Sequence, residues 1–309
     1  MAITAKQVKE LREMTGAGMM DCKKALGQTD GDMDKAVEWL RENGLAKAAK
    51  KSGRIAAEGI VAVDVSEDGK TASIVEVNSE TDFVAKNEKF QDYVAEVAAQ
   101  AKTTSATDID AFLAEPWALD TSVTVDEKLK AMIAVIGENM NIRRFAKIET
   151  EGTVVSYIHA GGKIGVLVEA DTDNANDAVK ECLKNVAMQI AALNPKYLSS
   201  DDVDAEYKEH EKEILLAQAK NDPKNANKPD EIIEKMITGR LNKELKEVCL
   251  LEQEYVKAEN KENVKKYVES VAKAEGVSIN LKSFVRFETG EGLEKKEEDF
   301  AAEVAAQMK

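Results

Sequence analysis

The sequence contains an internal repeat in which strand, turn, strand and long amphipathic helix occur twice in the same order. The first copy is predicted at 60–65, 71–77 and 88–102. The second copy is predicted at 153–159, 164–169 and 176–192. Each copy also closes with a similar strand, at 144–149 and at 285–288. The repeat therefore predicts an α+β fold with two related core subdomains.

The apolar faces of the two repeat helices can be aligned residue by residue. The alignment pairs one set with the other: Phe90, Tyr93, Val94 and Val97 with Val179, Cys182, Leu183 and Val186. The same register places Glu80, Asp82 and Phe83 opposite Glu169, Asp171 and Thr172. Both acids recur, whereas the aromatic does not. A feature of one copy alone indicates a working part, although Phe83 could instead cap the local core.

The first 45 or so residues predict a compact three-helix bundle. The first helix ends near Met14, the second covers 19–27, and the third begins after Asp32. Asn43-Gly44 is expected to stop the third helix, because these residues favour helix C-termini. The basic stretch that follows, which includes Lys47 and Arg54, is interpreted as a solvated helical connector.

A long polar segment interrupts the second copy. Two helical stripes are expected there: Val203, Tyr207, His210 and Ile214 on one helix, and Ile233, Met236, Ile237, Leu241 and Leu245 on the next. The break from Asn221 to Pro229 between them predicts an antiparallel helical hairpin. Such an arm is a candidate for homodimer formation or for contact with a partner. The alternative is that it is a protruding insertion without a binding role. A last helix is expected from Asp299, with Phe300, Val304 and Met308 on one face.

These signals divide the chain into four expected units. They are the helical bundle and connector at 1–54, core subdomain 1 at 55–149, core subdomain 2 at 150–290 with its hairpin insertion at about 199–250, and a C-terminal helical module at 291–309.

Composition excludes several function classes. The formal net charge of −15 disfavours direct binding to a phosphate backbone. No apolar run is long enough to span a membrane, and three widely spaced cysteines suit a reducing cytoplasm. With only His159 and His210, histidine triads and multi-histidine metal sites are nearly excluded. No phosphate-binding glycine motif is present.

The remaining chemistry points to a protein that works by contact. Glu80 and Asp82 could hold a divalent cation, but a solvated acidic loop is the favoured interpretation. We therefore expect no catalytic residue, no cofactor and no bound metal. An enzyme that uses Glu80 and Asp82 with a metal remains a minor alternative.

Several blocks resemble the bacterial elongation factor Ts family. They are LREMTGAGMMDCKKAL from Leu11 to Leu26, EVNSETDFVAKN from Glu76 to Asn87, IGEN from Ile136 to Asn139, IRR from Ile142 to Arg144, YIH with KIGVLV from Tyr157 to Val168, and DFAAEV from Asp299 to Val304. The blocks occur in order over nearly the whole chain. Ser79 departs from the family, which often has Cys there, and about 199–275 matches loosely.

This resemblance implies a guanine nucleotide exchange factor that binds elongation factor Tu with GDP and promotes GDP release in translation elongation. It implies a ubiquitin-associated-like N-terminal bundle that contacts the partner through Arg12, Met19 and Met20. The segment Thr81, Asp82, Phe83 and Val84 would intrude near the partner's magnesium site. His159 and the terminal helix would make further contacts. The alternative to an exchange factor is an interaction adaptor, which binds a partner through the N-terminal bundle without promoting nucleotide exchange.

Overall fold

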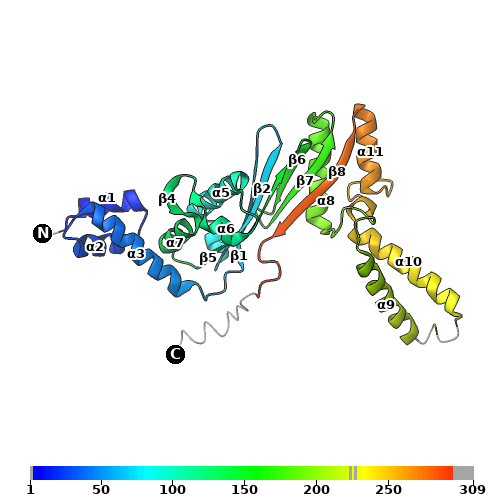
Figure 1. Ribbon diagram of the computed structural model, residues 1–309, viewed down its shortest axis with the longest axis horizontal. Coiled ribbons are helices and arrows are strands. Elements are labelled where there is room, and N and C mark those ends of the chain that lie inside the picture. Colours follow the sequence, from blue (N-terminus) through cyan, green and yellow to red (C-terminus); the bar gives the residue numbers. More distant parts are fainter. Residues whose placement is uncertain (1–2, 223–224, 226–227, 295–309) are drawn as a thin grey trace.

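The computed structural model describes residues 3–222, 225 and 228–294 of the chain (Figure 1). A helical bundle lies at one end, two small sheets with their helices lie in the middle, and a helical hairpin projects at the other end. The α+β class is confirmed. The helix expected from Asp299 lies outside the described residues. Within those residues, no helix combines the length and apolarity that a membrane crossing requires.

The N-terminal bundle consists of α1 (Ala5–Thr15), α2 (Met19–Gln28) and α3 (Met33–Lys51). Asp32 caps α3 through a hydrogen bond that its carboxylate accepts from the Lys35 amide. The apolar faces of the three helices enclose a small core, formed by Val8, Leu11, Cys22, Ala25, Leu26 and Ala36. The predicted three-helix region is therefore confirmed.

The expected stop at Asn43-Gly44 is wrong, because α3 continues to Lys51. Gly44 is buried where α3 crosses α7 (Val125–Ile136), and a Cβ built on it would lie 3.3 Å from the Cβ of Ala134. Glycine therefore serves close helix packing here. The Asn43 side chain donates a hydrogen bond to the Trp39 carbonyl at 2.9 Å, within the same helix. The connector thus packs against the core.

The first subdomain has a sheet in the order β1 (Glu58–Val65), β2 (Thr71–Ser79) and β5 (Met140–Glu149), all antiparallel. Its other elements are α4 (Asp82–Ala85), α5 (Glu88–Thr103), α6 (Ile109–Ala114), the hairpin β3 (Pro116–Trp117) with β4 (Asp120–Thr124), and α7. A capping box of Thr124 and Glu127 begins α7.

The second subdomain repeats this plan. Its sheet has the order β6 (Thr153–His159), β7 (Ile164–Thr172) and β8 (Ile279–Glu288). The sheet is covered by α8 (Asp177–Leu193) and by α11 (Val264–Glu275), which the sequence analysis did not predict. The signals for α11 were present: Val264, Val268 and Val271 share a face, and Gly276 ends the helix in the left-handed conformation.

Alternating side chains on the central strands separate the core into layers. Val75 and Val77 of β2 face the helices of the first subdomain, whereas Ile74 faces the second sheet. In β7, Val166 faces α8 and Leu167 faces the first sheet. The two sheets therefore pack on each other, with one helical layer outside each.

The two copies of the repeat are joined by a reciprocal pair of backbone hydrogen bonds. The Val61 amide of β1 donates to the carbonyl of Gly162 in the β6–β7 turn at 2.7 Å. The Val154 amide of β6 donates to the carbonyl of Gly69 in the β1–β2 turn at 2.8 Å. Each first strand thus binds the hairpin turn of the other copy, and the two bonds occupy equivalent positions in the repeat.

This symmetry corrects the register expected around Phe83. The helix pairing holds, since all eight paired residues are buried. In the strands, however, Glu76 and Glu169 are the equivalent acids, because each lies directly before the bulge of its central strand. The link from β2 to α5 covers 80–87, whereas the link from β7 to α8 covers only 173–176. The helix α4 with Phe83 is thus an addition to the first copy.

The predicted hairpin insertion is present as α9 (Ala205–Asn221) and α10 (Asp230–Val248). The two helices pack through their own apolar cluster, formed by Leu215, Ala219, Ile233 and Ile237 with Leu216 and Leu241. The stripe predicted for α9 was wrong in part, because His210 and Ile214 are exposed. The arm joins the core where Lys196 and Tyr197 donate backbone hydrogen bonds to Val248, just before the short 3₁₀ helix Leu250–Glu252.

Candidate functional site

The candidate site is built around α4, which we call with its flanking residues 80–87 the Phe83 turn. The Phe83 side chain is 81% exposed, the highest fraction among the large apolar side chains described. Thr81 caps α4 by accepting a hydrogen bond from the Val84 amide at 3.4 Å. Val84 packs against the core and Ala85 is buried. The turn is thus anchored while its aromatic ring points into solvent.

Glu138, in the link between α7 and β5, holds the start of this turn. Its Oε1 accepts a hydrogen bond from the Thr81 hydroxyl at 2.7 Å, and its Oε2 accepts one from the Thr81 amide at 3.0 Å. A carboxylate that accepts two such bonds fixes both the backbone and the side chain of its partner.

Glu80 ties the same turn to the end of α3. Its Oε1 accepts a hydrogen bond from the Asn139 amide at 2.5 Å and lies 3.4 Å from Arg54 Nη1. The Asn139 side chain in turn donates to the Arg54 carbonyl at 2.7 Å. Lys51, the last residue of α3, donates to the Gly137 carbonyl. Residues 137–139 therefore connect the N-terminal bundle to the Phe83 turn.

Asp82 forms an ion pair with Lys86, with Oδ2 and Nζ 2.6 Å apart. The hydrogen bond from Lys86 lowers the pKa of Asp82, and the charges of Lys86 and Lys163 lower it further. Asp82 and Glu80 thus each have their own cationic partner, which argues against a shared metal ion. Among the residues that the structure describes, no group of three or more His, Cys, Asp or Glu side chains could hold one.

His159 lies exposed at the end of β6, with Nδ1 3.0 Å from the Tyr157 hydroxyl. It precedes a tight turn in which Ala160, Gly161 and Gly162 all have positive φ. Lys163 follows, pairs with Glu58 at 2.5 Å and contributes to the field at Asp82. The β6–β7 hairpin that carries His159 therefore lies near the Phe83 turn.

Arg12, Met19 and Met20 are exposed on the bundle around the turn from α1 to α2. Gly16 ends α1 at a φ of +67°, which glycine adopts without strain. The two methionines find no place in the bundle core, whose members come from the opposite helix faces. The predicted contact residues therefore form two groups: one on the bundle, and one with Phe83 and His159 on the core subdomains.

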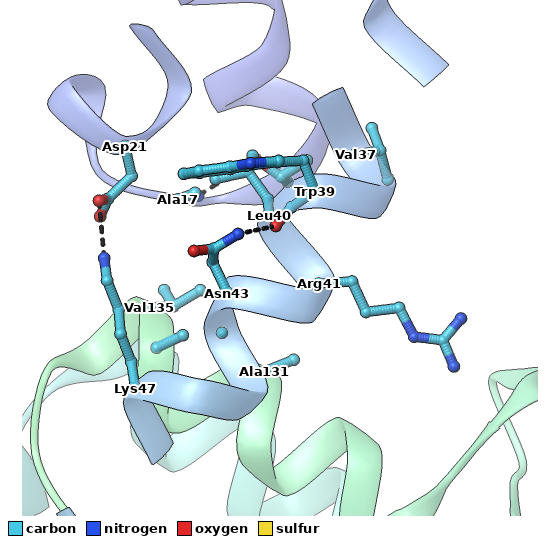
Figure 2. Close-up of a pocket in the computed structure, with 13 residues that line it drawn as sticks. Ala17, Asp21, Val37, Trp39, Leu40, Arg41, Asn43, Lys47, Ala131 and Val135 are labelled. Carbon is cyan, nitrogen blue, oxygen red and sulfur yellow. Dashed lines mark hydrogen bonds and ion pairs between the residues drawn. The ribbon is translucent and has the colours of Figure 1, made fainter. Parts of the chain in front are cut away.

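A pocket of about 170 Å³ lies where α2, α3 and α7 meet (Figure 2). The Trp39 ring lies across it, Leu40 and Val135 add apolar surface, and an ion pair from Lys47 to Asp21 at 2.6 Å closes one side. Its lining includes none of the predicted contact residues. We assign it to the junction between the bundle and α7.

Sequence reasoning missed the residues that support the site. Glu138 lies within a block that resembles the family but had no predicted role, because its partner Thr81 is remote in sequence. Glu76 also had no predicted role, although it does not contact the Phe83 turn: it is fully buried, and its carboxylate accepts hydrogen bonds from Arg143, Arg144 and the Gly290 amide. Burial alone would raise the pKa of Glu76, but the Gly290 amide, Asn78 and Arg144 outweigh it and lower the pKa.

Comparison with known proteins finds a family and relatives that carry the same description. The family described as "Elongation factor TS" matches residues 80–291. The protein named "Elongation factor Ts" of Clostridioides difficile (strain 630) is 57% identical over 307 residues, which cover 99% of each chain. The protein of the same name from Trichlorobacter lovleyi is 54% identical over 311 residues, which cover 99% of this chain and 98% of that protein. That of Clostridium novyi (strain NT) is 53% identical over 307 residues, 99% of each.

Proposed function

Because this chain belongs to the elongation factor Ts family, we propose that it is the guanine nucleotide exchange factor of elongation factor Tu. In this role it binds elongation factor Tu with GDP and promotes GDP release by disturbing the partner's magnesium and phosphate site. The chain itself makes and breaks no covalent bond. It acts in translation elongation, and we place it in the cytoplasm.

The observation that carries the proposal is the exposed Phe83 ring on an anchored turn. An apolar ring that is 81% exposed has no role in the core of this chain. Phenylalanine has few rotatable bonds, so that little side-chain entropy is lost when it enters a pocket. In the proposed complex, Phe83 acts as a wedge beside the partner's cation, with Asp82 next to it. Thr81 and Val84 hold these two residues in place.

The other predicted residues supply docking contacts. Met19 and Met20 offer flexible apolar side chains, and Arg12 on the adjacent helix offers a charged one. His159 is positioned on the hairpin near the Phe83 turn. In this scheme, contact through the bundle brings the Phe83 turn to the nucleotide site.

The energetics require no chemical step. GDP is held through its phosphates and a bridging magnesium ion, so that displacement of groups around the ion removes much of the attraction. Each ~1.4 kcal/mol by which insertion weakens nucleotide binding raises the dissociation constant about tenfold. The coupling is reciprocal, so GDP weakens binding of the factor by the same ratio.

The test is GDP release from purified elongation factor Tu, measured with wild type, Phe83→Ala and Leu119→Ala. Leu119 is a matched control, because it is 71% exposed on the β3–β4 hairpin and outside the predicted site. Wild type and Leu119→Ala should accelerate GDP release. With Phe83→Ala, the accelerated rate of GDP release should fall about tenfold or more. No acceleration by wild type would refute the exchange function. Stable binding without a change in GDP lifetime would favour the adaptor.

A further inference from the structure

The Phe83 turn is oriented by a carboxylate from a distant part of the chain. We propose that Glu138 is a positioning residue, which holds Thr81 so that Phe83 is presented to the partner in a fixed direction. This assignment rests on the proposed exchange function, since that function gives the orientation of Phe83 its consequence.

The turn needs an external support because α4 has only four residues. A single helical turn is unstable alone, since its nucleation costs more than its one or two hydrogen bonds return. Its local contacts are the backbone hydrogen bonds of 2.9–3.4 Å within 81–87, side-chain bonds from Ser79 and Gln91, the long Thr81–Val84 bond and the exposed Lys86–Asp82 pair. Exposed ion pairs contribute little. Tertiary contacts must therefore set its direction.

Glu138 supplies that contact at the N-terminal side. Both carboxylate oxygens are used on one residue: Oε2 for the Thr81 amide and Oε1 for the Thr81 hydroxyl. The amide bond fixes the backbone where α4 begins, and the hydroxyl bond fixes the rotamer of the capping side chain. Burial of Ala85 anchors the other side. Phe83 lies between the two anchors.

Glu138 is itself carried by a well-defined segment. Gly137 ends α7 in the left-handed conformation, with its amide bonded to the Ile133 carbonyl. Asn139 is buried, and its side chain bonds the carbonyl of Arg54. The carboxylate is thus fixed between a helix end and a strand, which suits a support for a functional residue.

The physical consequence concerns rate more than docking. A ring that is already oriented loses less conformational freedom when it inserts into a partner. Without Glu138, the turn samples other directions, and only a fraction of docked complexes present Phe83 productively. The bundle contacts remain unchanged. Loss of Glu138 should therefore lower the maximal exchange rate and leave the half-saturating concentration nearly unchanged.

The variant is Glu138→Gln, which keeps the shape but retains one acceptor oxygen, so that the Thr81 amide and hydroxyl can no longer each donate to an oxygen of their own. We expect the maximal rate of GDP release from elongation factor Tu to fall about tenfold, equivalent to about 1.4 kcal/mol. The half-saturating concentration should stay within about twofold. Asp126→Asn, which removes one negative charge at the other end of α7, is the matched control and should behave as wild type.

A second variant keeps the proposal testable if Glu138→Gln folds poorly. Thr81→Val loses the hydroxyl that donates to Glu138 and should reproduce the Glu138→Gln defect. In the free protein, hydrogen exchange at the Thr81 and Val84 amides should accelerate in Glu138→Gln, while the unfolding midpoint stays unchanged.

The outcomes separate the two claims. No acceleration by wild type would overturn the exchange function. A wild-type maximal rate in Glu138→Gln, beside an active wild type, would overturn the positioning role alone. The same follows if Thr81→Val keeps the wild-type maximal rate, or if amide exchange in the Phe83 turn is unaffected.

Discussion

Gly44 of α3 lies against Ala134 of α7, so that a Cβ on Gly44 would come within 3.3 Å of the Ala134 Cβ. This contact lies where the helix of the bundle leaves its own core and packs on the first subdomain. It therefore fixes the bundle, with Arg12, Met19 and Met20, relative to the segment that carries Phe83.

Gly44→Leu should disrupt this crossing. A larger side chain forces the two helices apart, and overpacking of this kind costs about 1–3 kcal/mol. Gly27→Leu is the control, because Gly27 lies in α2, a Cβ added there would meet nothing within 4 Å, and the change should be tolerated. Urea denaturation measures both. Equal stability of the two variants would contradict close packing at Gly44.

Gly59→Ala and Gly152→Ala should destabilise the protein severely and to a similar extent. A Cβ at Gly59 would lie 2.2 Å from the Val77 carbonyl oxygen, and one at Gly152 would lie 2.2 Å from that of Ala170. Both contacts are with backbone, which cannot move aside cheaply, so losses of about 4 kcal/mol or more are expected.

Gly161→Ala provides the comparison, since its φ is +65° but nothing lies within 4 Å of the added atom. Only the left-handed backbone is strained, and a cost of about 1 kcal/mol is expected. Calorimetric unfolding of the three variants distinguishes these cases. A mild effect at Gly59 with a severe one at Gly152 would argue against the equivalence of the two copies.

The buried Glu76 should make the free energy of unfolding decrease as the pH falls into the acid range. Its folded-state pKa lies below the ordinary value of 4.5. The unfolded chain therefore binds the proton first, so the stabilisation is complete above that value and declines as pH falls through the folded-state pKa. Urea unfolding between about pH 3 and pH 7 should show this decline.

Glu76→Gln should flatten that profile and destabilise the protein by about 3 kcal/mol near neutral pH, because Arg143 and Arg144 lose their buried partner. Glu67→Gln, at an exposed position in the β1–β2 turn, should retain the wild-type profile. If both variants show the same pH dependence, Glu76 is not its source.

The helical arm should be removable without loss of the core fold. Its apolar cluster contains only residues of α9 and α10, and its base is held by separate backbone bonds at Val248. Replacement of 211–243 with a short glycine-rich turn should leave the near-UV circular dichroism and the unfolding of the core unchanged.

The same variant tests whether the arm forms a homodimer, one of the roles considered for it. If the arms associate, the full chain sediments as a dimer and the shortened chain as a monomer. A full chain that sediments as a monomer over the whole concentration range would contradict self-association through the arm.

Local signals predicted much of the fold. The buried faces of α5 and α8 and the helical hairpin of α9 and α10 depend on residues close in sequence, and the structure has them. The helix stop expected at Asn43-Gly44 was wrong because Gly44 serves a tertiary contact. The local sequence does not reveal that Ala134 approaches Gly44. The helix α11 also has local signals, since Val264, Val268 and Val271 share one face and Gly276 ends it.

The candidate site divides in the same way. Phe83 stood out because only one copy of the repeat has it, and its exposure agrees with a role in contact. The bonds from Glu138 to Thr81 and from Asn139 to Glu80 join segments remote in sequence, so no local pattern could predict them. The expected pairing of Glu80 with Glu169 failed because α4 lengthens one link, which a helix alignment does not detect.

Under the proposed function, the longer link between β2 and α5 carries the contact with the partner and is separate from what keeps the chain folded. The second subdomain closes the same sheet and helix through 173–176 alone. A chain shortened at 80–87 to that length should thus still assemble both sheets, yet present nothing to insert into another protein. Natural variation in this segment can then change the action of the factor while the scaffold stays the same.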